Sequence, residues 1–278
     1  MRQHIYRSLW GMEGTIAQQA PNIAAAGYDG IEAPLPPTTE VDLWRRTLAA
    51  HDLHYIAMIF TQGMTIAEHL VSFRQQVVAA QALAPDLITS HSGYDGWNEA
   101  ESLQFCQEAS KIAEESAVRV AHETHRGRIF FHPWITQRLI QAVPALQLCA
   151  DFSHWVCVCE RLLADEEAMM AQITQHCLHI HARIGYEEGP QVPDPRDPTY
   201  STQVQIHEHW WDLIWQAQAA QGQPVSTLTP EFGPPPYQQT LPYTAMPVSD
   251  LVVVCDWQAH RQRQRFAQTF DQPIQHAP

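Results

Sequence analysis

Positive charge is scarce in this sequence, and lysine is almost absent. The 278 residues include 30 Asp and Glu but only 16 Lys and Arg, a formal net charge of −14, and Lys111 is the only lysine. This balance repels nucleic-acid phosphate and anionic membrane surfaces, although a local basic cleft can exist within it. A Schiff-base enzyme needs a lysine on a strand, whereas Lys111 lies in a helical pattern. We therefore expect no nucleic-acid partner, no membrane partner and no Schiff-base chemistry.

Long apolar runs and paired cysteines are also missing. No window approaches the roughly 18 apolar residues of a membrane-spanning helix, and Met1–Arg7 does not open an apolar segment of the kind found in signal peptides. The six cysteines show no C-x-x-C pair and no framework spacing, which indicates free, mostly buried thiols in a reducing compartment. We expect a cytoplasmic protein.

A glycine-rich phosphate-binding turn is absent as well. The first predicted strand runs into Trp10-Gly11-Met12-Glu13-Gly14, which lacks the G-x-G-x-x-G spacing of an open dinucleotide-binding sheet. Instead, short apolar strands alternate with helical stretches about eight times, which predicts a parallel sheet closed into a barrel. We therefore predict the α/β class and a (β/α)8 TIM barrel that forms a single domain over residues 1–278.

The predicted elements cover most of the chain. The strands are His4–Leu9, Gly30–Ala33, Tyr55–Phe60, Leu87–Ser90, Arg119–Glu123, Gln147–Asp151, Leu178–His181 and Ser226–Glu231. The helices are Thr15–Ala26, Val41–His51, Ile66–Leu83, Glu99–Ser116, Ile135–Val143, Glu166–His176, His207–Gln221 and Ser249–Phe270. Two irregular stretches, Gly185–Thr202 and Phe232–Pro247, follow the last two strands. We interpret them as a lid or rim, because long loops at this face are usually functional.

Four predicted strands end in a side chain that can bind a metal ion. These residues are Glu123, Asp151, His181 and Glu231. Because the strand C-termini of a β/α barrel meet around a common centre, we expect the carboxylates and the imidazole to lie together. Mostly oxygen ligands with one nitrogen suit a divalent cation. The sequence therefore predicts a divalent-metal site at this end of the barrel.

The three carboxylates also have simpler interpretations. Glu123 can form an ion pair at the loop edge with Arg126 or Arg128. Asp151 can be the N-cap of the following segment, which is a common role for aspartate. Glu231 can be an exposed loop acid, but the prolines on both sides of it favour a fixed ligand.

Strand periodicity predicts which neighbouring side chains face the site. His179 and His181 are two residues apart, so both can face the barrel interior, with His181 nearer the open end and His179 deeper. Arg183 continues this parity and can hold an anionic or hydroxylated group of a substrate. His122 should point away from Glu123, towards the helices.

Three more residues are candidates for contacts around the site. His91 ends the fourth strand and can contact substrate, and a structural role for it is an equal alternative. Trp10 after the first strand and Glu32 near the end of the second are further candidates for the rim.

Together, Glu123, Asp151-x-x-His154, His179-x-His181 and Glu231 resemble the xylose-isomerase-like TIM barrel superfamily, which includes sugar isomerases, ketose 3-epimerases, inosose dehydratases and apurinic endonucleases. The resemblance extends over nearly the whole chain. The epimerase branch implies that the matching Glu, Asp, His and Glu bind one divalent metal ion, usually Mn²⁺ or Co²⁺, with Mg²⁺ or Zn²⁺ as alternatives. It also implies that Glu123 and Glu231 are the catalytic acid/base pair, and that His154 and Arg183 contact substrate oxygens.

These residues predict a metal-dependent isomerase or epimerase acting on a sugar, or on a sugar-like polyol or keto acid. A carboxylate would remove a proton next to a carbonyl, and the metal would stabilise the enediolate. A metal-dependent dehydratase or hydrolase and a non-catalytic sugar-binding barrel are the alternatives, while the net charge argues against an endonuclease. Substrate identity, its phosphorylation and the native metal stay open, and we expect a homodimer or homotetramer.

Overall fold

Eight parallel strands form a closed barrel in chain order, with β8 pairing back onto β1. The computed structural model describes residues 1–270, so residues 271–278 of the predicted domain lie outside the described part. The strands are β1 (Arg2–Ser8), β2 (Gly30–Pro34), β3 (His54–Phe60), β4 (Leu87–His91), β5 (Val120–Glu123), β6 (Leu148–Ala150), β7 (Cys177–His181) and β8 (Val225–Thr229). The prediction of a (β/α)8 TIM barrel is confirmed.

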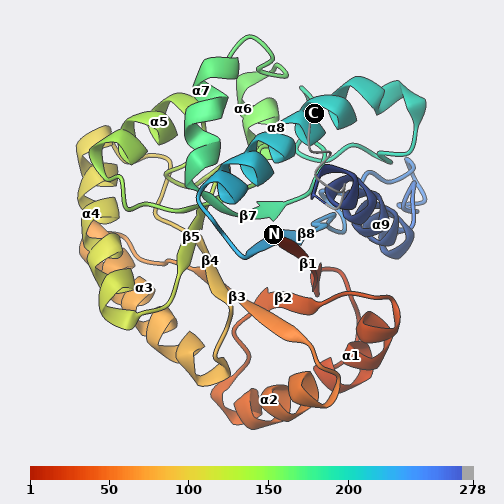
Figure 1. Cartoon of the computed structure of the whole chain (residues 1–278), viewed down its shortest axis with the longest axis horizontal. Coiled ribbons are helices and arrows are strands. Elements are labelled where there is room, and N and C mark those ends of the chain that lie inside the picture. Colours follow the sequence, from red (N-terminus) through yellow and green to blue (C-terminus); the bar gives the residue numbers. More distant parts are fainter. Residues whose placement is uncertain (271–278) are drawn as a thin grey trace, which may run out of the picture.

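Helices surround the barrel as an outer ring (Figure 1). They are α1 (Ile16–Ala25), α2 (Val41–Ala50), α3 (Ile66–Ala80), α4 (Glu99–Ser116), α5 (Pro133–Ala142), α6 (Ser153–Cys159), α7 (Glu167–Ile173), α8 (Ser201–Ala220) and α9 (Leu251–Phe270). Short 3₁₀ turns cover Thr38–Glu40, Gln81–Leu83, Thr174–His176 and Pro198–Tyr200.

Two parts of the predicted pattern were wrong. The short helix α6 was not predicted, because seven residues are too few for a clear helical period. Helix α8 begins at Ser201 rather than His207, since a 3₁₀ turn after Asp197 leads directly into it. The predicted loop after β7 is therefore shorter at its C-terminal end than the sequence indicated.

Capping interactions fix where the helices next to the site begin. At the start of α3, the Thr65 hydroxyl accepts the Glu68 N–H at 3.3 Å, and the Glu68 carboxylate accepts the Thr65 N–H at 3.0 Å. Asn98 and Glu101 make the same reciprocal pair at the start of α4. Such capping boxes satisfy N–H groups that have no partner within the helix. They define the ends of the β3–α3 and β4–α4 loops, which lie on the same face as the predicted metal site.

The interior of the barrel changes from apolar to polar along its axis. One end is filled by a cluster of Tyr6, Ile56, Leu87, Ala121 and Cys149, all fully buried. Towards the strand C-termini the inward side chains become polar, beginning with buried Glu32 and Thr89. The apolar layer closes the barrel below the polar layer, so the polar groups are accessible only from the C-terminal face.

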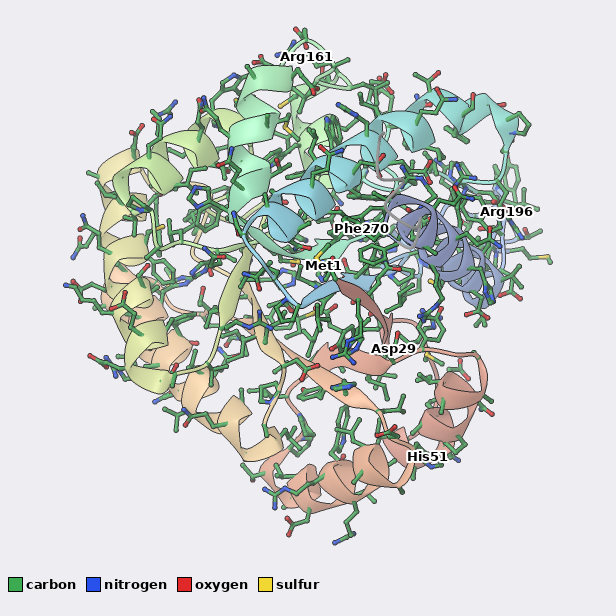
Figure 2. The ribbon with its side chains drawn as sticks, viewed as in Figure 1. Met1, Asp29, His51, Arg161, Arg196 and Phe270 are labelled. Carbon is green, nitrogen blue, oxygen red and sulfur yellow. The ribbon has the colours of Figure 1, made fainter. Side chains whose placement is uncertain are left out.

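Many charged side chains lie on the outer surface, such as Arg161 and Arg196 in Figure 2. Helix α9 completes the ring next to α1, because Arg263 donates to Asp29 at 3.0 Å and Tyr28 donates to Asp256 at 2.8 Å. All six cysteines are free, as the sequence predicted. Within residues 1–270, no helix is both long and apolar enough to cross a bilayer.

Candidate metal centre and active-site cavity

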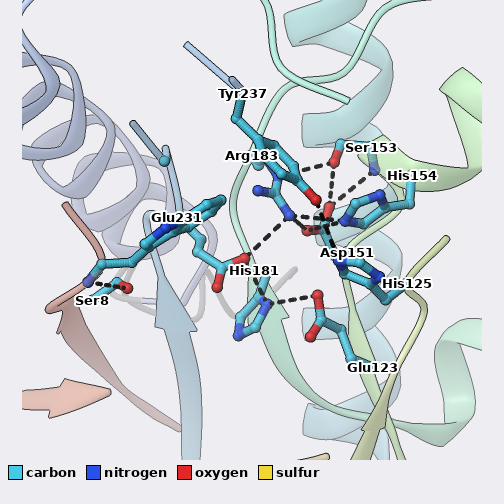
Figure 3. A network of polar contacts seen from close by, with 12 residues as sticks. Ser8, Glu123, His125, Asp151, Ser153, His154, His181, Arg183, Glu231 and Tyr237 are labelled. Atoms are coloured by element: carbon cyan, nitrogen blue, oxygen red, sulfur yellow. Dashed lines mark hydrogen bonds and ion pairs between the residues drawn. The ribbon is translucent and has the colours of Figure 1, made fainter. Parts of the chain in front are cut away.

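The four predicted metal ligands converge at the C-terminal end of the barrel (Figure 3). Glu123 and His181 are the last residues of β5 and β7, while Asp151 and Glu231 follow β6 and β8. One ligand atom from each residue lies within 4.8 Å of those of the others, and all four side chains are buried. The rigid strands thus hold three carboxylates and one imidazole around one point.

The atoms at this point suit a divalent cation. Both carboxylate oxygens of Glu123 and Nδ1 of His181 are buried, and none has a hydrogen-bond partner within residues 1–270. Nδ1 lies 3.0 Å from Glu231 Oε2 and 3.5 Å from Glu123 Oε1, but without the geometry of a hydrogen bond. Buried polar atoms without partners are costly. A cation bound by three carboxylates and a neutral imidazole would satisfy them.

Glu32 fixes the orientation of the His181 ring from below. Its Oε1 lies 3.0 Å from His181 Nε2, and its Oε2 lies 3.1 Å from His179 Nε2. The hydroxyls of Thr89 and Thr229 also donate to this carboxylate. A proton on Nε2 of His181 leaves the Nδ1 lone pair free for a cation, which is the usual role of a carboxylate next to a metal-binding histidine.

Arg183 occupies the other side of the cluster. Its guanidinium contacts Asp151, lies 3.2 Å from Glu231 Oε2, and donates from Nε to the Ser153 hydroxyl at 3.2 Å. His154 Nε2 lies 3.0 Å from Arg183 Nη2. Burial, followed by the nearby charges, holds the pKa of His154 well below 6.5. The neutral ring therefore accepts a hydrogen bond from Arg183.

Burial raises the pKa of both Glu123 and Asp151, but the neighbouring charges give the two carboxyl groups opposite net shifts. Burial raises the pKa of Glu123, but His91 and His181 oppose it so strongly that the pKa lies well below its usual value. For Asp151, burial raises the pKa to about 6, because Glu123 and Glu231 offset much of the effect of Arg183. A bound cation favours the ionised form of every ligand carboxylate.

A cavity of about 500 Å³ opens above the cluster. Glu123, Glu231 and Arg183 line it together with His91, whose Nε2 lies 2.6 Å from Glu123 Oε2. The remaining lining residues are Ser8, Leu9, Trp10, Gly11, Pro34, Met58, Phe60, His125, Arg128 and Tyr237. His154 is fully buried beside Asp151 and does not belong to this lining.

The structure also separates the alternative interpretations of these residues. Glu123 pairs with His91 and His181, and no ion pair joins it to Arg126 or Arg128 within the described residues. Asp151 is not the N-cap of α6, because Phe152 holds that position, although Asp151 Oδ1 accepts the Ser153 N–H at 3.2 Å. Its side chain instead belongs to the cluster of candidate ligands, where Oδ2 contacts Arg183.

The alternation of side chains along the strands correctly predicted the directions of His122 and His179. The ring of His122 faces the helix layer, where it stacks on Phe73 of α3 with centroids 5.9 Å apart. His179 lies deeper than His181, at hydrogen-bond distance from Thr227.

The prediction from the sequence missed or misplaced three residues of the site. Glu32 was expected at the rim, whereas it lies within β2 and is fully buried in the barrel. A charged residue inside an apolar strand was the available signal. His125 lies in the cavity wall next to His154, with ring centroids 4.0 Å apart, and burial lowers its pKa to about 3. Tyr237 comes from the loop after β8, and no local pattern indicated that its ring would lie 4.9 Å from the Arg183 guanidinium carbon.

The fold and the buried ligand cluster define a TIM barrel with a candidate metal centre at its strand C-termini. The sequence model of the xylose isomerase-like TIM barrel family matches residues 21–197. This match covers more than half of the chain, so the protein belongs to that family. No curated protein matches the chain in sequence.

Solved structures of the same fold include proteins with several activities. A xylose isomerase-like TIM barrel protein from Mycobacterium smegmatis, in complex with magnesium, has a TM-score of 0.64 and 13% identity over 95% of this chain and 97% of its own. An AP endonuclease, family 2, from Brucella melitensis has a TM-score of 0.62 and 17% identity over 84% and 93%. The 3-keto-D-glucoside 4-epimerase from E. coli has a TM-score of 0.60 and 12% identity over 96% and 100%. At these identities the similarity shows the fold alone.

Proposed function

We propose that the protein is a divalent-metal-dependent isomerase or epimerase of a sugar, or of a sugar-like polyol or keto acid. The observation that carries this proposal is the cluster of Glu123, Asp151, His181 and Glu231, whose ligand atoms lie within 4.8 Å of one another. Membership of the xylose isomerase-like family and the fold shared with an epimerase support it. Mn²⁺ or Co²⁺ are the proposed metals, and the magnesium complex of the Mycobacterium smegmatis protein supports a site for a hard divalent cation.

The two glutamates are the proposed proton carriers. A divalent cation held by the four ligands would supply an electrophile for a substrate carbonyl and its neighbouring hydroxyl. Glu123 and Glu231 reach the cavity from β5 and from the loop after β8, so a substrate between them meets one carboxylate on each side. One would remove the proton bound to carbon and the other would return it. The low pKa of Glu123 keeps this carboxylate ionised, which is the form that can accept a proton.

The other cavity residues hold this arrangement. His91 lies against one Glu123 oxygen at 2.6 Å and limits the rotation of that carboxylate. Arg183 balances the charges of Asp151 and Glu231, and its position at the cavity wall supports a contact with a substrate oxygen. His154 supports Arg183 from behind. We propose His91 and Arg183 as direct substrate contacts and His154 as a residue that positions Arg183.

The test is exchange of a carbon-bound proton with solvent. Mn²⁺-loaded and Co²⁺-loaded protein are incubated in D₂O with a panel of ketoses, inososes and sugar acids such as D-glucuronate and D-galacturonate, and deuterium at carbon is followed by NMR. We expect exchange with at least one compound, and its loss in Glu231→Gln. Glu187→Gln, which alters a carboxylate in the loop after β7 outside the ligand cluster and the cavity lining, should exchange normally. No exchange with any compound by metal-loaded protein would refute the proposal, and release of water without exchange into recovered substrate would indicate a dehydratase instead.

A further inference from the structure

The cavity wall contains a cation that makes no ion pair with a carboxylate within residues 1–270. Of its two arginines, Arg183 is paired with Asp151 and Glu231. Arg128 lines the same cavity, and among residues 1–270 it forms no ion pair and donates only to backbone carbonyls. A half-buried guanidinium stays protonated at all ordinary pH values. Its charge is therefore available to a ligand in the cavity.

Backbone carbonyls fix the position of this guanidinium. Nη1 of Arg128 donates to Thr61 O at 3.2 Å and to Gly93 O at 3.1 Å, at the ends of β3 and β4. The Gly93 N–H donates to the Thr61 hydroxyl at 2.7 Å, which ties the two loops together. Gly93 has a φ of +63°, and a Cβ there would come within 2.7 Å of Ile129 and Trp97. The loop thus depends on glycine for its conformation, and it holds Arg128 in one orientation.

The donors that remain on Arg128 match a planar oxyanion. An arginine has five N–H donors, of which two point from Nη1 to the carbonyls, so Nε and Nη2 keep three. Side by side, Nε and Nη2 fit the two oxygens of a carboxylate in a bidentate pair. A phosphate dianion would leave one negative charge unbalanced, because no second unpaired cation lines the cavity within residues 1–270.

Four apolar side chains also line this cavity, and they strengthen an ion pair formed beside them. Leu9, Trp10, Met58 and Phe60 line the cavity, and the ring of Phe60 stacks on His91 with centroids 4.4 Å apart. Such surroundings exclude water and lower the local dielectric constant, so an ion pair formed there is stronger than one on the surface.

We propose that Arg128 binds a carboxylate of the substrate, so that the site takes a hydroxy-carbonyl compound bearing a carboxylate rather than a neutral or phosphorylated sugar. The hydroxy-carbonyl part of this substrate rests on the proposed function, in which a metal ion held by the four ligand residues binds that group. Binding of the acid group does not depend on turnover, so the two proposals can fail separately.

Binding of matched acid and neutral compounds tests this inference directly. The probes are D-glucuronate against D-glucose and D-galacturonate against D-galactose, with D-glucose 6-phosphate as the phosphorylated arm, each titrated into Mn²⁺-loaded protein by calorimetry. At least one uronate should bind roughly 10-fold to 100-fold more tightly than its neutral partner, as expected for a charge-assisted bidentate hydrogen bond. Arg128→Gln should abolish this preference and Arg128→Lys should keep part of it.

Arg126→Gln is the matched control. Arg126 lies two residues away on the same loop and carries the same charge, but it packs on Tyr237 and does not belong to the cavity lining. The preference should persist in this variant. The proposal would be overturned if the uronate and the neutral sugar of every pair bound equally, or if neither bound. It would also be overturned if Arg126→Gln and Arg128→Gln lost the acid preference equally, or if D-glucose 6-phosphate bound more tightly than the uronates. An acid preference that depends on Arg128 without deuterium exchange would refute only the isomerase.

Discussion

Glu32 is the residue whose replacement tests the candidate metal centre most sharply without removing a ligand. Each of its oxygens accepts from two groups. Oε1 accepts from His181 and Thr89, and Oε2 accepts from His179 and Thr229. The substitution Glu32→Gln keeps the shape of the side chain but turns one of these acceptors into a donor.

Either orientation of the new amide weakens the centre. If the NH₂ group faces His181, Nε2 must become an acceptor, and the proton then moves to Nδ1, the atom that would bind the metal. If it faces His179, that ring can change its tautomer by donating from Nδ1 to Thr227, 2.8 Å away. In that case His181 keeps its orientation but loses the negative charge that raises its basicity. Loss of such a supporting carboxylate typically lowers metal affinity by about 10-fold to 100-fold, or about 1.4 to 2.8 kcal/mol.

The assay is the dissociation constant for Mn²⁺, measured from the EPR signal of the free ion in wild-type protein and Glu32→Gln. Glu208→Gln is the control, because Glu208 of α8 is also a buried glutamate but pairs with Arg261 of α9, at 2.6 Å. Its Mn²⁺ affinity should be unchanged even if its stability falls. A folded Glu32→Gln protein with the affinity of the wild type would refute the reasoning about His181.

Three further outcomes are expected. Glu231→Gln should weaken Mn²⁺ binding and reduce turnover by at least about 100-fold without unfolding the barrel. If this variant kept the metal content and activity of the wild type, the assignment of Glu231 as ligand and proton carrier would be wrong. Arg183→Met should destabilise the metal-free protein by about 3 to 5 kcal/mol, because the charge of the buried Asp151 then has no partner. Mn²⁺ should restore much of this stability, and an equal loss in metal-free and metal-loaded denaturation curves would contradict the prediction. Burial lowers the pKa of His122 from 6.5 to about 4, so the native state favours the neutral ring and loses stability as the pH falls from 6.5 towards 4. At pH 5 this effect amounts to about 2 kcal/mol, and His122→Phe should reduce by that amount the stability difference between pH 7 and pH 5 in urea denaturation of metal-free protein.

The positions of the candidate ligands were predictable because strand ends and side-chain parity are local properties of the chain. An apolar run that stops at a carboxylate or an imidazole shows where a strand leaves the core. The spacing of His179 and His181 places both on one face. Eight repeats of strand and helix then imply closure, and closure brings those strand ends together. The short helix α6 and the true start of α8 escaped this reasoning, because seven residues are too few for a clear helical period and a 3₁₀ turn leads into α8.

What the sequence left open depends on residues that meet only after the barrel closes. Glu32 and His181 are 149 positions apart, and their contact exists because β2 and β7 face each other across the interior. Arg128 is five residues from Glu123, and the sequence offered a local ion pair between them. The folded loop instead turns Arg128 towards the carbonyls of Thr61 and Gly93 and leaves its charge open to the cavity. Local periodicity therefore determined which side chains reach the centre, while the packing of distant strands and loops decided which charges are paired and which remain for a substrate.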